Sequence, residues 1–427
     1  MRYPEKLLHF IWRYKLINPQ NLKTTAGEEL QILDFGQYNT DAGADFEFAK
    51  IRLNGSVWAG NVEMHVESQD WNRHNHQHDA RYNTTILHVV WEADEGEKVL
   101  RQDGTEIPTL AMKDFVDPSL PERYMELMQQ QHPIACAYRL PQIASFHVYS
   151  WLDRVLIERL ETKSLLIEEW LEQTANDWEK VTIISLARSF GMAINQHAFE
   201  RLMKSIPLNL IYKYAEEEDK LEALLFGCAG LLDMSEMKDS YARKLKEEFQ
   251  YLKMLHRLQP MEKESWKFMR MRPYNFPTIR LAQLCALLRQ RVRWFEYIRK
   301  NSLETVMQAC REVEVASYWN EHFHFGKVTK VHPTTVTESF VTHLVVNTFV
   351  PVLFAYGRFL GDERLKDKAV EWLSLLPSED NNIIRKFREL GVQSRSAGDG
   401  QAIIQLYKSY CVVKRCLDCA LGYYCLR

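Results

Sequence analysis

The sequence predicts an α+β protein, with an N-terminal mixed α/β domain followed by a large all-α region. Residues 1–116 begin with one amphipathic helical segment and continue as short runs rich in β-branched and aromatic residues, which is typical of strands. From residue 121 onward, apolar residues recur at helical spacing almost to the end. The proline-containing segment 117–121 separates these two patterns. We therefore expect domains at 1–116 and 117–427.

The elements of the first domain follow in chain order. A helix is predicted where four apolar residues have 3–4 spacing: Leu7, Leu8, Ile11 and Trp12. Strands are predicted at five alternating or apolar segments: Leu30–Phe35, Phe46–Leu53, Val57–Val66, Thr85–Trp91 and Lys98–Gln102. The polar segment Asp70–Asn83 separates the third and fourth strands and is expected to be a partly helical crossover.

The second region reads as helices separated by Pro and Gly. Clear helical patterns are Trp151–Thr162, Val181–Gly191, Leu221–Leu232, Ala242–Leu258, Thr278–Arg293 and Arg364–Leu376. No repeat period is evident, which argues against a solenoid. The region forms one domain or two, with a break expected near 263–275, and it ends in a cysteine-rich tail at 411–425.

Composition narrows the class of protein. Apolar residues make up 46% of the 427 residues and the net charge is −3, so binding of nucleic acid requires a local basic patch. The N-terminus lacks the apolar core of a signal peptide. The most apolar run, Phe340–Tyr356, is interrupted by His343, Asn347 and Pro351 and is expected to be buried rather than membrane-spanning. We expect a cytoplasmic protein with reduced or metal-bound cysteines; the oligomeric state stays open.

The most informative stretch is a predicted hairpin around Asn54-Gly55, a turn signal. An acid, Asp45, begins one strand, and Glu63-Met64-His65 lies on the next. A two-residue loop would place Asp45 opposite Met64, an unfavourable pairing. A three-residue loop or bulge instead places Phe46 opposite Met64 and Phe48 opposite Val62, so the apolar residues agree. The same register places Asp45 opposite His65.

That register also sets Glu47 opposite Glu63, so the polar side chains share one face. Opposed side chains lie about 5 Å apart at Cβ, and two carboxylates at that range repel unless a cation or proton lies between them. The hairpin therefore predicts a divalent-cation site. A surface hairpin with a solvated acidic face remains the alternative.

The order helix, three strands, crossover, strand resembles the core of the PD-(D/E)XK nuclease superfamily, a restriction-endonuclease-like fold. In that superfamily an Asp begins the second strand, a Glu-x-Lys lies on the third, and a Glu from the first helix often joins. The matching positions are Asp45, Glu63 and Glu5, with His65 in place of the lysine. The resemblance implies hydrolysis of phosphodiesters with Mg²⁺ or Mn²⁺. His65 departs from the pattern: it could act as a base, bind metal, or mark a loss of catalysis.

Three histidines follow within five residues: His74, His76 and His78. Histidine-rich tracts bind Zn²⁺ and other transition metals. A polar crossover loop whose histidines form local hydrogen bonds is the alternative. His88 lies in an apolar strand and is expected to be a core histidine.

A basic belt is predicted in the helical region, since residues 260–300 carry ten Lys or Arg against three acids. Aromatic residues interleave with these cations, a pattern that suits a nucleic-acid backbone and its bases. The candidate contacts are Arg270, Arg272, Arg280, Arg289, Arg291 and Arg293. A helix with a basic solvent face would look similar.

The tail has the spacing Cys411-x4-Cys416-x2-Cys419-x5-Cys425. It resembles the iron–sulphur loop of endonuclease III-like DNA glycosylases, whose first gap is two residues longer, and the end of iron–sulphur nucleases. The resemblance implies a [4Fe–4S] cluster or a structural Zn²⁺. Burial as small hydrophobic residues is the alternative. The other four cysteines read as core residues: Cys136, Cys228, Cys285 and Cys310.

Several strings together resemble one uncharacterised bacterial domain-of-unknown-function family, number 2851. They include Gly43-Ala44-Asp45-Phe46, Gly60-Asn61-Val62-Glu63-Met64-His65, Arg272-Pro273-Tyr274-Asn275-Phe276-Pro277, and Cys416-Leu417-Asp418-Cys419. This resemblance spans most of the chain and implies one coherent protein, without an activity.

Three functions are compatible with these features. The first is a metal-dependent nuclease, or a nucleic-acid-binding protein derived from one. The second is a non-catalytic binding or scaffold protein. The third is a transition-metal enzyme that uses the histidines on a small molecule.

Overall fold

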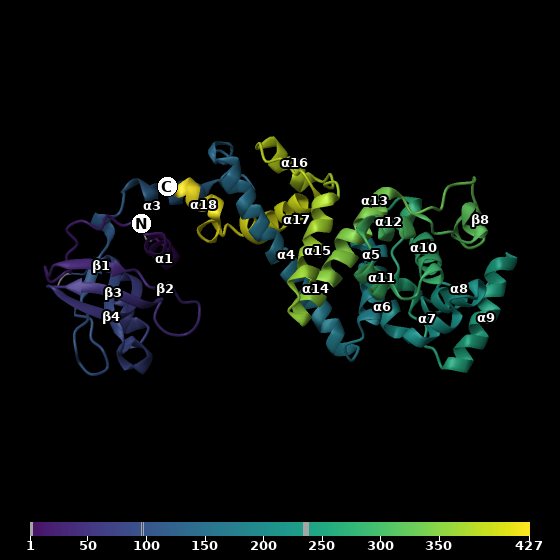
Figure 1. Ribbon diagram of the computed structural model, residues 1–427, viewed down its shortest axis with the longest axis horizontal. Helices are drawn as coiled ribbons and strands as arrows, with labels where there is room; N and C mark the ends of the chain where they lie inside the picture. The colour runs from purple at the N-terminus through teal and green to yellow at the C-terminus, as the bar shows by residue number, and fades with distance from the viewer. Residues whose placement is uncertain (1–2, 95, 97, 234–238) are drawn as a thin grey trace. The chain divides into compact units, whose positions relative to one another are not determined.

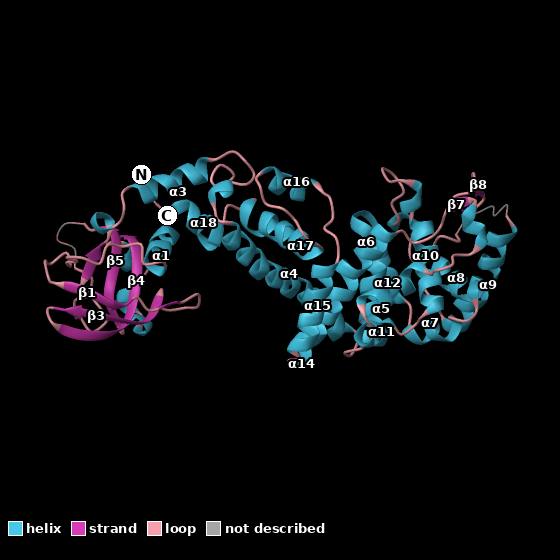
Figure 2. Cartoon of the chain, turned by 45° about the horizontal axis from the view of Figure 1, so that its top comes forward, coloured by secondary structure: helices cyan, strands magenta, loops and turns pink. Residues whose placement is uncertain are grey.

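The computed structural model describes residues 3–94, 96, 98–233 and 239–427. Its contacts divide the chain into two compact units. Unit 1 contains residues 1–151, 386–392 and 406–427, and unit 2 contains residues 152–385 and 393–405. The fold is α+β: Figure 2 shows the main sheet in the N-terminal part and helices along the remainder.

Unit 1 is built on a mixed sheet. Its strands are β1 (Leu30–Asp34), β2 (Gln37–Tyr38), β3 (Phe46–Leu53), β4 (Ser56–Glu67), β5 (Thr85–Glu92) and β6 (Thr109–Ala111). The order is β1-β3-β4-β5-β6, and β2 pairs with β3. The β3–β4 pair is antiparallel, whereas β5 lies parallel to β4 and β6 parallel to β5. The segment between β4 and β5 holds the short helix α2 (Asp70–Arg73) and two 3-10 turns, so it is a crossover, as predicted.

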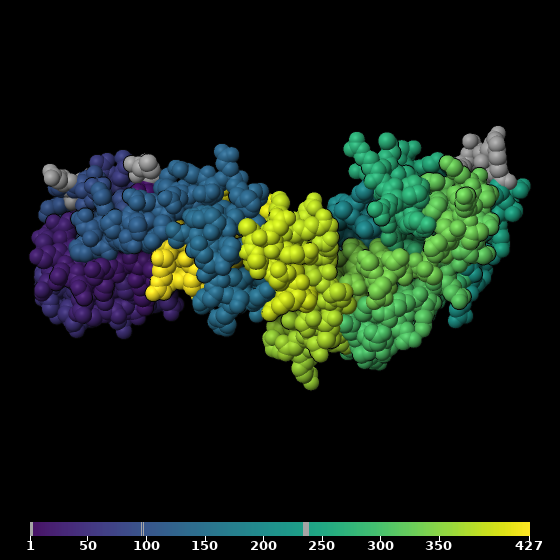
Figure 3. Space-filling view, turned by 90° about the horizontal axis from the view of Figure 1, so that it is seen from above, coloured from purple at the N-terminus to yellow at the C-terminus, as the bar shows by residue number. Residues whose placement is uncertain are grey.

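Helices pack around this sheet. Helix α1 (Glu5–Arg13) buries Leu7, Leu8, Ile11 and Trp12 and contacts β4, beside which it lies in Figure 1. Helices α3 (Ser119–Gln129) and α18 (Ala420–Leu426) contact each other. Unit 1 therefore extends beyond residue 116 and includes the C-terminal residues. Figure 3 shows these residues, in yellow, against the N-terminal part.

The register of the β3–β4 hairpin differs from the prediction. Leu53 pairs with Ser56, so the loop Asn54-Gly55 has two residues rather than three, and the bulge that was predicted as the other possibility is present instead. Further along, Phe46 pairs with Val62 because a β-bulge interrupts the ladder between Phe46 and Ala49.

The bulge explains the error. Phe46 and Ala49 are both buried, and a regular strand cannot turn two residues three apart toward the same face. Phe48 points to solvent with 69% exposure, whereas the prediction placed it on the inner face opposite Val62. The bulge brings Asp45 beside Glu63 rather than opposite His65.

Two further differences concern the ends of the sheet. Lys98–Gln102 forms no strand; Leu100 makes only an isolated bridge with Glu106. Strand β6 and the two-residue strand β2 were not predicted, because both are too short to show alternation.

Unit 2 is helical. Its helices are α5 (Trp178–Phe190), α6 (Met192–Ser205), α7 (Leu208–Tyr214), α8 (Glu218–Cys228), α9 (Ser240–His256), α10 (Pro277–Gln290), α11 (Trp294–Lys300), α12 (Leu303–Arg311), α13 (Glu338–Leu344), α14 (Val350–Leu360), α15 (Glu363–Leu375) and α17 (Ala397–Leu406). Helices α4 (Ser145–Gln173) and α16 (Asn382–Glu389) contribute residues to both units. Strands β7 (His322–His324) and β8 (Lys327–Val328) form a small hairpin.

The apolar run of unit 2 is a core element. Residues Glu338–Leu360 have the length and composition of a membrane span, but 78% of the most apolar window is buried inside the protein. Within it, Val345–Phe349 forms a π-helical turn between α13 and α14. Burial of this kind is typical of a core helix in a folded domain.

Candidate metal centre in unit 1

Two carboxylates lie side by side at the edge of the bulge. The Asp45 backbone N–H donates to Glu63 Oε2 at 3.1 Å, and the Met64 backbone N–H donates to Asp45 Oδ2 at 2.9 Å. Glu63 is only 5% exposed. These reciprocal bonds between the two strands fix both side chains at one point of the sheet.

Helix α1 adds an acid and a histidine to this point. His9 Nε2 lies 3.2 Å from Asp45 Oδ2 and 3.8 Å from Glu5 Oε1. Glu5 and His9 are four residues apart on α1, so they share one face of the helix. The hydroxyl of Tyr38 lies 3.5 Å from the other ring nitrogen of His9.

Imidazoles from β4 and the crossover complete the cluster. His65 Nε2 lies 3.2 Å from His74 Nδ1 and 3.6 Å from Glu63 Oε1. His76 Nε2 lies 3.2 Å from the same Glu63 oxygen. His65, His74 and His76 each offer a nitrogen within 4.8 Å of the others, an arrangement that can hold a metal ion.

A second layer orients His65. Its Nδ1 lies 2.9 Å from His88 Nε2, and His88 is fully buried on β5. If His65 Nδ1 donates this bond, His65 Nε2 keeps a lone pair directed at the cluster. Metal-ligating histidines commonly use a hydrogen bond of this kind to fix their tautomer.

The electrostatics of the cluster favour a bound cation. Burial and the neighbouring Asp45 raise the pKa of Glu63 to about 9. Burial and the surrounding histidines lower the pKa of His65 to about 2, so its imidazole is neutral, the form that binds metal. Burial and the adjacent His76 likewise lower the pKa of His88 to about 3. His9 behaves differently: burial lowers its pKa, but Asp45, Glu5 and Glu63 outweigh burial and raise it.

The spacing of the donors matches a coordination shell. His76 Nε2 is buried and has no hydrogen-bond partner among the described residues, although Glu63 Oε1 is 3.2 Å away. Two ligand atoms about 2.1 Å from one ion lie about 3.0–3.4 Å apart in octahedral or tetrahedral geometry. A cation between Glu63 and His76 would satisfy both groups, and the exposed His74 leaves an open side for water or substrate.

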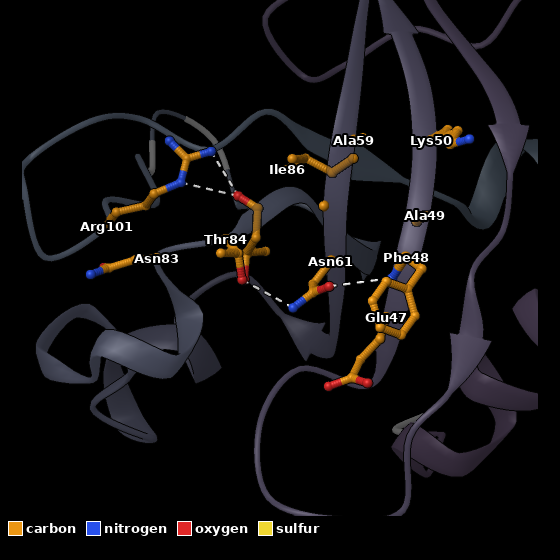
Figure 4. A pocket seen from close by; sticks show the side chains of 12 residues that line it. Glu47, Phe48, Ala49, Lys50, Ala59, Asn61, Asn83, Thr84, Ile86 and Arg101 are labelled. Atoms are coloured by element: carbon orange, nitrogen blue, oxygen red, sulfur yellow. Dashed lines mark hydrogen bonds between the residues drawn. The ribbon is translucent and has the colours of Figure 1, made fainter.

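The bulge that aligns Asp45 lines an open groove of about 620 Å³ between β3, β4 and the start of β5. Figure 4 shows Asn61 bridging this groove: its Oδ1 accepts the Phe48 N–H at 3.3 Å and its Nδ2 donates to Thr84 Oγ1 at 3.0 Å. A Cβ on Gly60 would approach Thr84 O to 2.4 Å, so the close approach of the strands here requires glycine.

One family model, described as a protein of unknown function (DUF2851), matches residues 5–382. The chain belongs to this family. Searches among curated proteins and among solved structures gave no match. The DUF2851 match includes the candidate metal centre and most of the helical part, but its description assigns no activity. A function can therefore be inferred only from the chemistry of the site.

Four of the residues predicted to act in catalysis meet in this DUF2851 protein: Glu5, Asp45, Glu63 and His65. His74 and His76 join them, whereas His78 is exposed and is not among the histidines whose nitrogens converge. His9 was missed, although its position one helical turn after Glu5 was visible in the sequence. His88 is buried, as predicted, but it also supports His65.

The predicted basic belt is not one continuous surface. Arg280 is 8% exposed, lies 3.6 Å above the Phe340 ring, donates to Gln283 and Asn275, and lines a pocket of unit 2. Arg289 pairs with Glu218. Arg291 stacks on its neighbour Tyr297. Three belt arginines are exposed: Arg270, Arg272 and Arg293.

The predicted tail ligands lie in unit 1. Cys416, Cys419 and Cys425 are buried, and Cys411 is partly exposed. The 3-10 turn Cys416–Asp418 contacts α1. Cys136, assigned to the core by sequence, is buried next to the tail.

Proposed function

We propose that this DUF2851 protein is a divalent-metal-dependent hydrolase of phosphodiesters, with its active centre in unit 1. One observation carries the proposal: buried Glu63 and three imidazoles converge on one point, where His76 Nε2 has no hydrogen-bond partner among the described residues. A buried carboxylate and a buried lone pair that face each other are costly unless a cation or proton lies between them.

The donor set favours a transition-metal ion. Mg²⁺ prefers an octahedral shell of oxygens, whereas imidazole suits Mn²⁺, Fe²⁺ and Zn²⁺. Glu63, His65, His74 and His76 would hold the ion, and Asp45 would complete the shell or bind a coordinated water. Of the two ions implied by the nuclease resemblance, this set favours Mn²⁺ over Mg²⁺.

The ion would polarise a phosphate and lower the pKa of a bound water. Asp45 lies between this shell and His9, so it can orient the attacking water. His9 lies against Asp45 and Glu5. From this position its imidazole can donate a proton to the leaving oxygen. A metal-bound water, an orienting carboxylate and a proton donor suffice for hydrolysis of a phosphodiester.

Nucleic acid is the proposed substrate, because the order of elements around the site resembles a nuclease core. The exposed arginines Arg270, Arg272 and Arg293 of unit 2 remain available to contact a phosphate backbone. The buried Arg280 is left out of this proposal.

Cleavage assays test the proposal. We expect the purified protein to cut single- or double-stranded DNA or RNA with Mn²⁺, more slowly with Mg²⁺, and not with EDTA. Asp45→Asn and Glu63→Gln should each lower the rate at least about 100-fold, because each removes a charge that binds the ion or orients the water.

His78→Gln is the matched control. It removes an imidazole from the same segment but from outside the cluster, so its cleavage rate should equal that of the wild type. Far-UV circular dichroism should show all three variants folded. Absence of cleavage with every ion, or equal loss in His78→Gln, would contradict the proposal.

A second candidate function uses the same ion on a small molecule. The three imidazoles favour it, because they would bind Fe²⁺ or Zn²⁺ without help from Asp45. In that case the protein would bind one transition ion per chain, Asp45→Asn would keep the ion, and no nucleic acid would be cut. Metal analysis of Asp45→Asn and Glu63→Gln therefore separates the two candidates.

A further inference from the structure

The open groove beside the bulge lies one step along β4 from the candidate metal centre. Its lining comes from residues 47–50 of β3, 59–61 of β4, 83–86 around the start of β5, and Arg101. Asn61 precedes Glu63 by two residues on β4. Side chains two residues apart on a strand lie on the same face of the sheet. The groove and the buried carboxylate therefore share one face of β4.

A phenylalanine in this groove has its ring in solvent. Phe48 is 69% exposed, and Figure 4 shows its ring beside Asn61, whose Oδ1 accepts the Phe48 N–H. No other aromatic ring in the described part of the chain contacts it. An aromatic ring without such partners leaves its face free to stack on a ligand.

The backbone conformation at Phe48 costs free energy. Its φ is 60°, in the left-handed region that disfavours a bulky side chain and that glycine adopts without strain. A strained residue with an exposed side chain adds little to the packing of the core. Such residues cluster at functional sites, where the strain is retained for binding or catalysis. Binding therefore explains a phenylalanine at this position better than folding does.

Two cations line the groove on opposite sides, as Figure 4 shows. Lys50 is exposed on β3. Arg101 Nε and Nη2 donate to the Thr85 carbonyl at 3.0 Å and 2.7 Å, which fixes the guanidinium on the other wall. Neither cation forms an ion pair within the residues that the structure describes. Cations that flank an exposed ring suit a nucleic-acid strand, because they contact phosphates while the ring stacks on a base.

Stacking on a side-chain ring requires an unpaired base. In a duplex each base is stacked on its neighbours, and extracting it costs free energy, whereas a single strand presents its bases freely. The groove has the volume of a small-ligand site, about 620 Å³ against a usual range of about 300–1,000 Å³. It therefore has room for a few nucleotides of one strand rather than for a double helix.

We propose that this groove binds single-stranded nucleic acid and that Phe48 stacks on an unpaired base there. Lys50 and Arg101 contact the phosphates, and the strand continues along β4 to the candidate metal centre. This inference rests on the proposed hydrolase function and names its substrate as a single strand. DNA and RNA share the stacked base and the phosphate backbone, so the test compares the two.

Fluorescence anisotropy with labelled oligonucleotides tests the proposal in a buffer without divalent ions, so that nothing is cut. The full-length protein should bind single-stranded DNA or RNA of about 10 nucleotides at least about tenfold more tightly than the duplex of the same sequence. The strand that binds more tightly identifies the sugar. Phe48→Leu keeps an apolar side chain but loses the ring, so it should weaken binding at least about fivefold, whereas Phe48→Tyr should keep it.

Phe146→Leu is the matched control. Phe146 is a phenylalanine of unit 1 that is 74% exposed and lies outside the groove, so its replacement should leave the affinity unchanged. If Phe48→Leu does not fold, Phe48→Gly, which suits the backbone conformation, should show the same loss.

Four outcomes would overturn the proposal: no binding by the wild type, equal affinity for single strand and duplex, unchanged affinity in Phe48→Leu, or an equal loss in Phe146→Leu. The two proposals fail separately. Binding that depends on Phe48, without cleavage by any ion, contradicts the hydrolase activity alone. Cleavage by a protein whose strand affinity is the same in Phe48→Leu contradicts the role of the groove alone.

Discussion

The candidate metal centre of unit 1 and the arginine belt of unit 2 both bury ionisable groups, but the neighbours of these groups differ. Arg280 stacks on Phe340 and donates from two of its guanidinium nitrogens to Gln283 and Asn275, although its Nε has no partner among the described residues and burial lowers its pKa to about 10. Glu63 Oε2 accepts one backbone N–H from Asp45, but the Asp45 carboxylate repels a charged Glu63, and the nearby His76 Nε2 has no hydrogen-bond partner among the described residues.

The difference separates an architectural role from a functional one. A buried charge with complete partners contributes to the fold, and removing it costs stability. A buried cluster of lone pairs and carboxylates lowers stability until an ion occupies it. Residue type alone did not reveal this, because arginine in a belt and histidine in a tract are equally polar in the sequence.

The largest expected effect is the response to metal. At a Mn²⁺ concentration about 100-fold above its Kd, binding should stabilise the folded protein by about 2.7 kcal/mol. Glu63→Gln should abolish this stabilisation, because a neutral amide replaces the carboxylate that would bind the ion beside His65 and His76. Differential scanning fluorimetry with and without Mn²⁺ measures it. An equal rise in melting temperature for the variant would show that the ion binds elsewhere.

The second prediction concerns the belt. Arg280→Ala should destabilise unit 2 by about 2.5 kcal/mol, because it removes a cation–π contact and leaves the acceptors of Gln283 and Asn275 unpaired. Urea unfolding measures this loss. The exposed Arg293 is the control: Arg293→Ala should change stability by less than about 0.5 kcal/mol. Equal losses of stability in the two variants would mean that the buried Arg280 contributes no more to the fold than the exposed Arg293.

The sequence predicted the members of the candidate metal centre better than their arrangement. Asp45, Glu63 and His65 follow from a local hairpin pattern, and the helix with Glu5 follows from apolar spacing. The register was wrong because a bulge is decided by which aromatic residue is buried, and Phe46 and Phe48 look equivalent in the sequence.

Long-range contacts were beyond local patterns altogether. Cys136 sits in an apolar context and was assigned to the core, and only the fold brings it to Cys425. Arg280 was predicted to contact nucleic acid, but it is buried in α10, where nearly all residues are buried. A count of charges along the chain cannot show which face of a helix is covered.

The third prediction concerns Glu222 of unit 2, a buried carboxyl that has one hydrogen-bond donor but a raised pKa. This carboxyl is 3% exposed, Tyr241 donates a hydrogen bond to it, and burial raises its pKa to about 7. A carboxyl with a raised folded pKa loses stability as pH rises from about 4.5 to about 7, since the unfolded chain releases the proton first. Glu222→Gln keeps an acceptor for Tyr241 without this loss.

We therefore expect Glu222→Gln to be more stable than the wild type by about 2 kcal/mol at pH 8, with little difference near pH 4.5. Chemical unfolding at both pH values checks it. A variant less stable than the wild type at pH 8 would mean that the hydrogen bond from Tyr241 stabilises the charged form of Glu222 more than burial destabilises it.

The smallest effect is expected at the bulge that aligns Asp45. Phe48 adopts φ of 60°, a left-handed conformation that disfavours a side chain, and its ring is 69% exposed. Phe48→Gly should therefore stabilise the folded protein by about 0.5–1 kcal/mol, because relief of the backbone conformation outweighs the lost packing. Equilibrium unfolding measures the gain, and unchanged Mn²⁺ affinity would show that Asn61 and the inward Phe46 and Ala49 are enough to hold the register. Loss of Mn²⁺ affinity would instead mean that the ring of Phe48 itself keeps Asp45 beside Glu63.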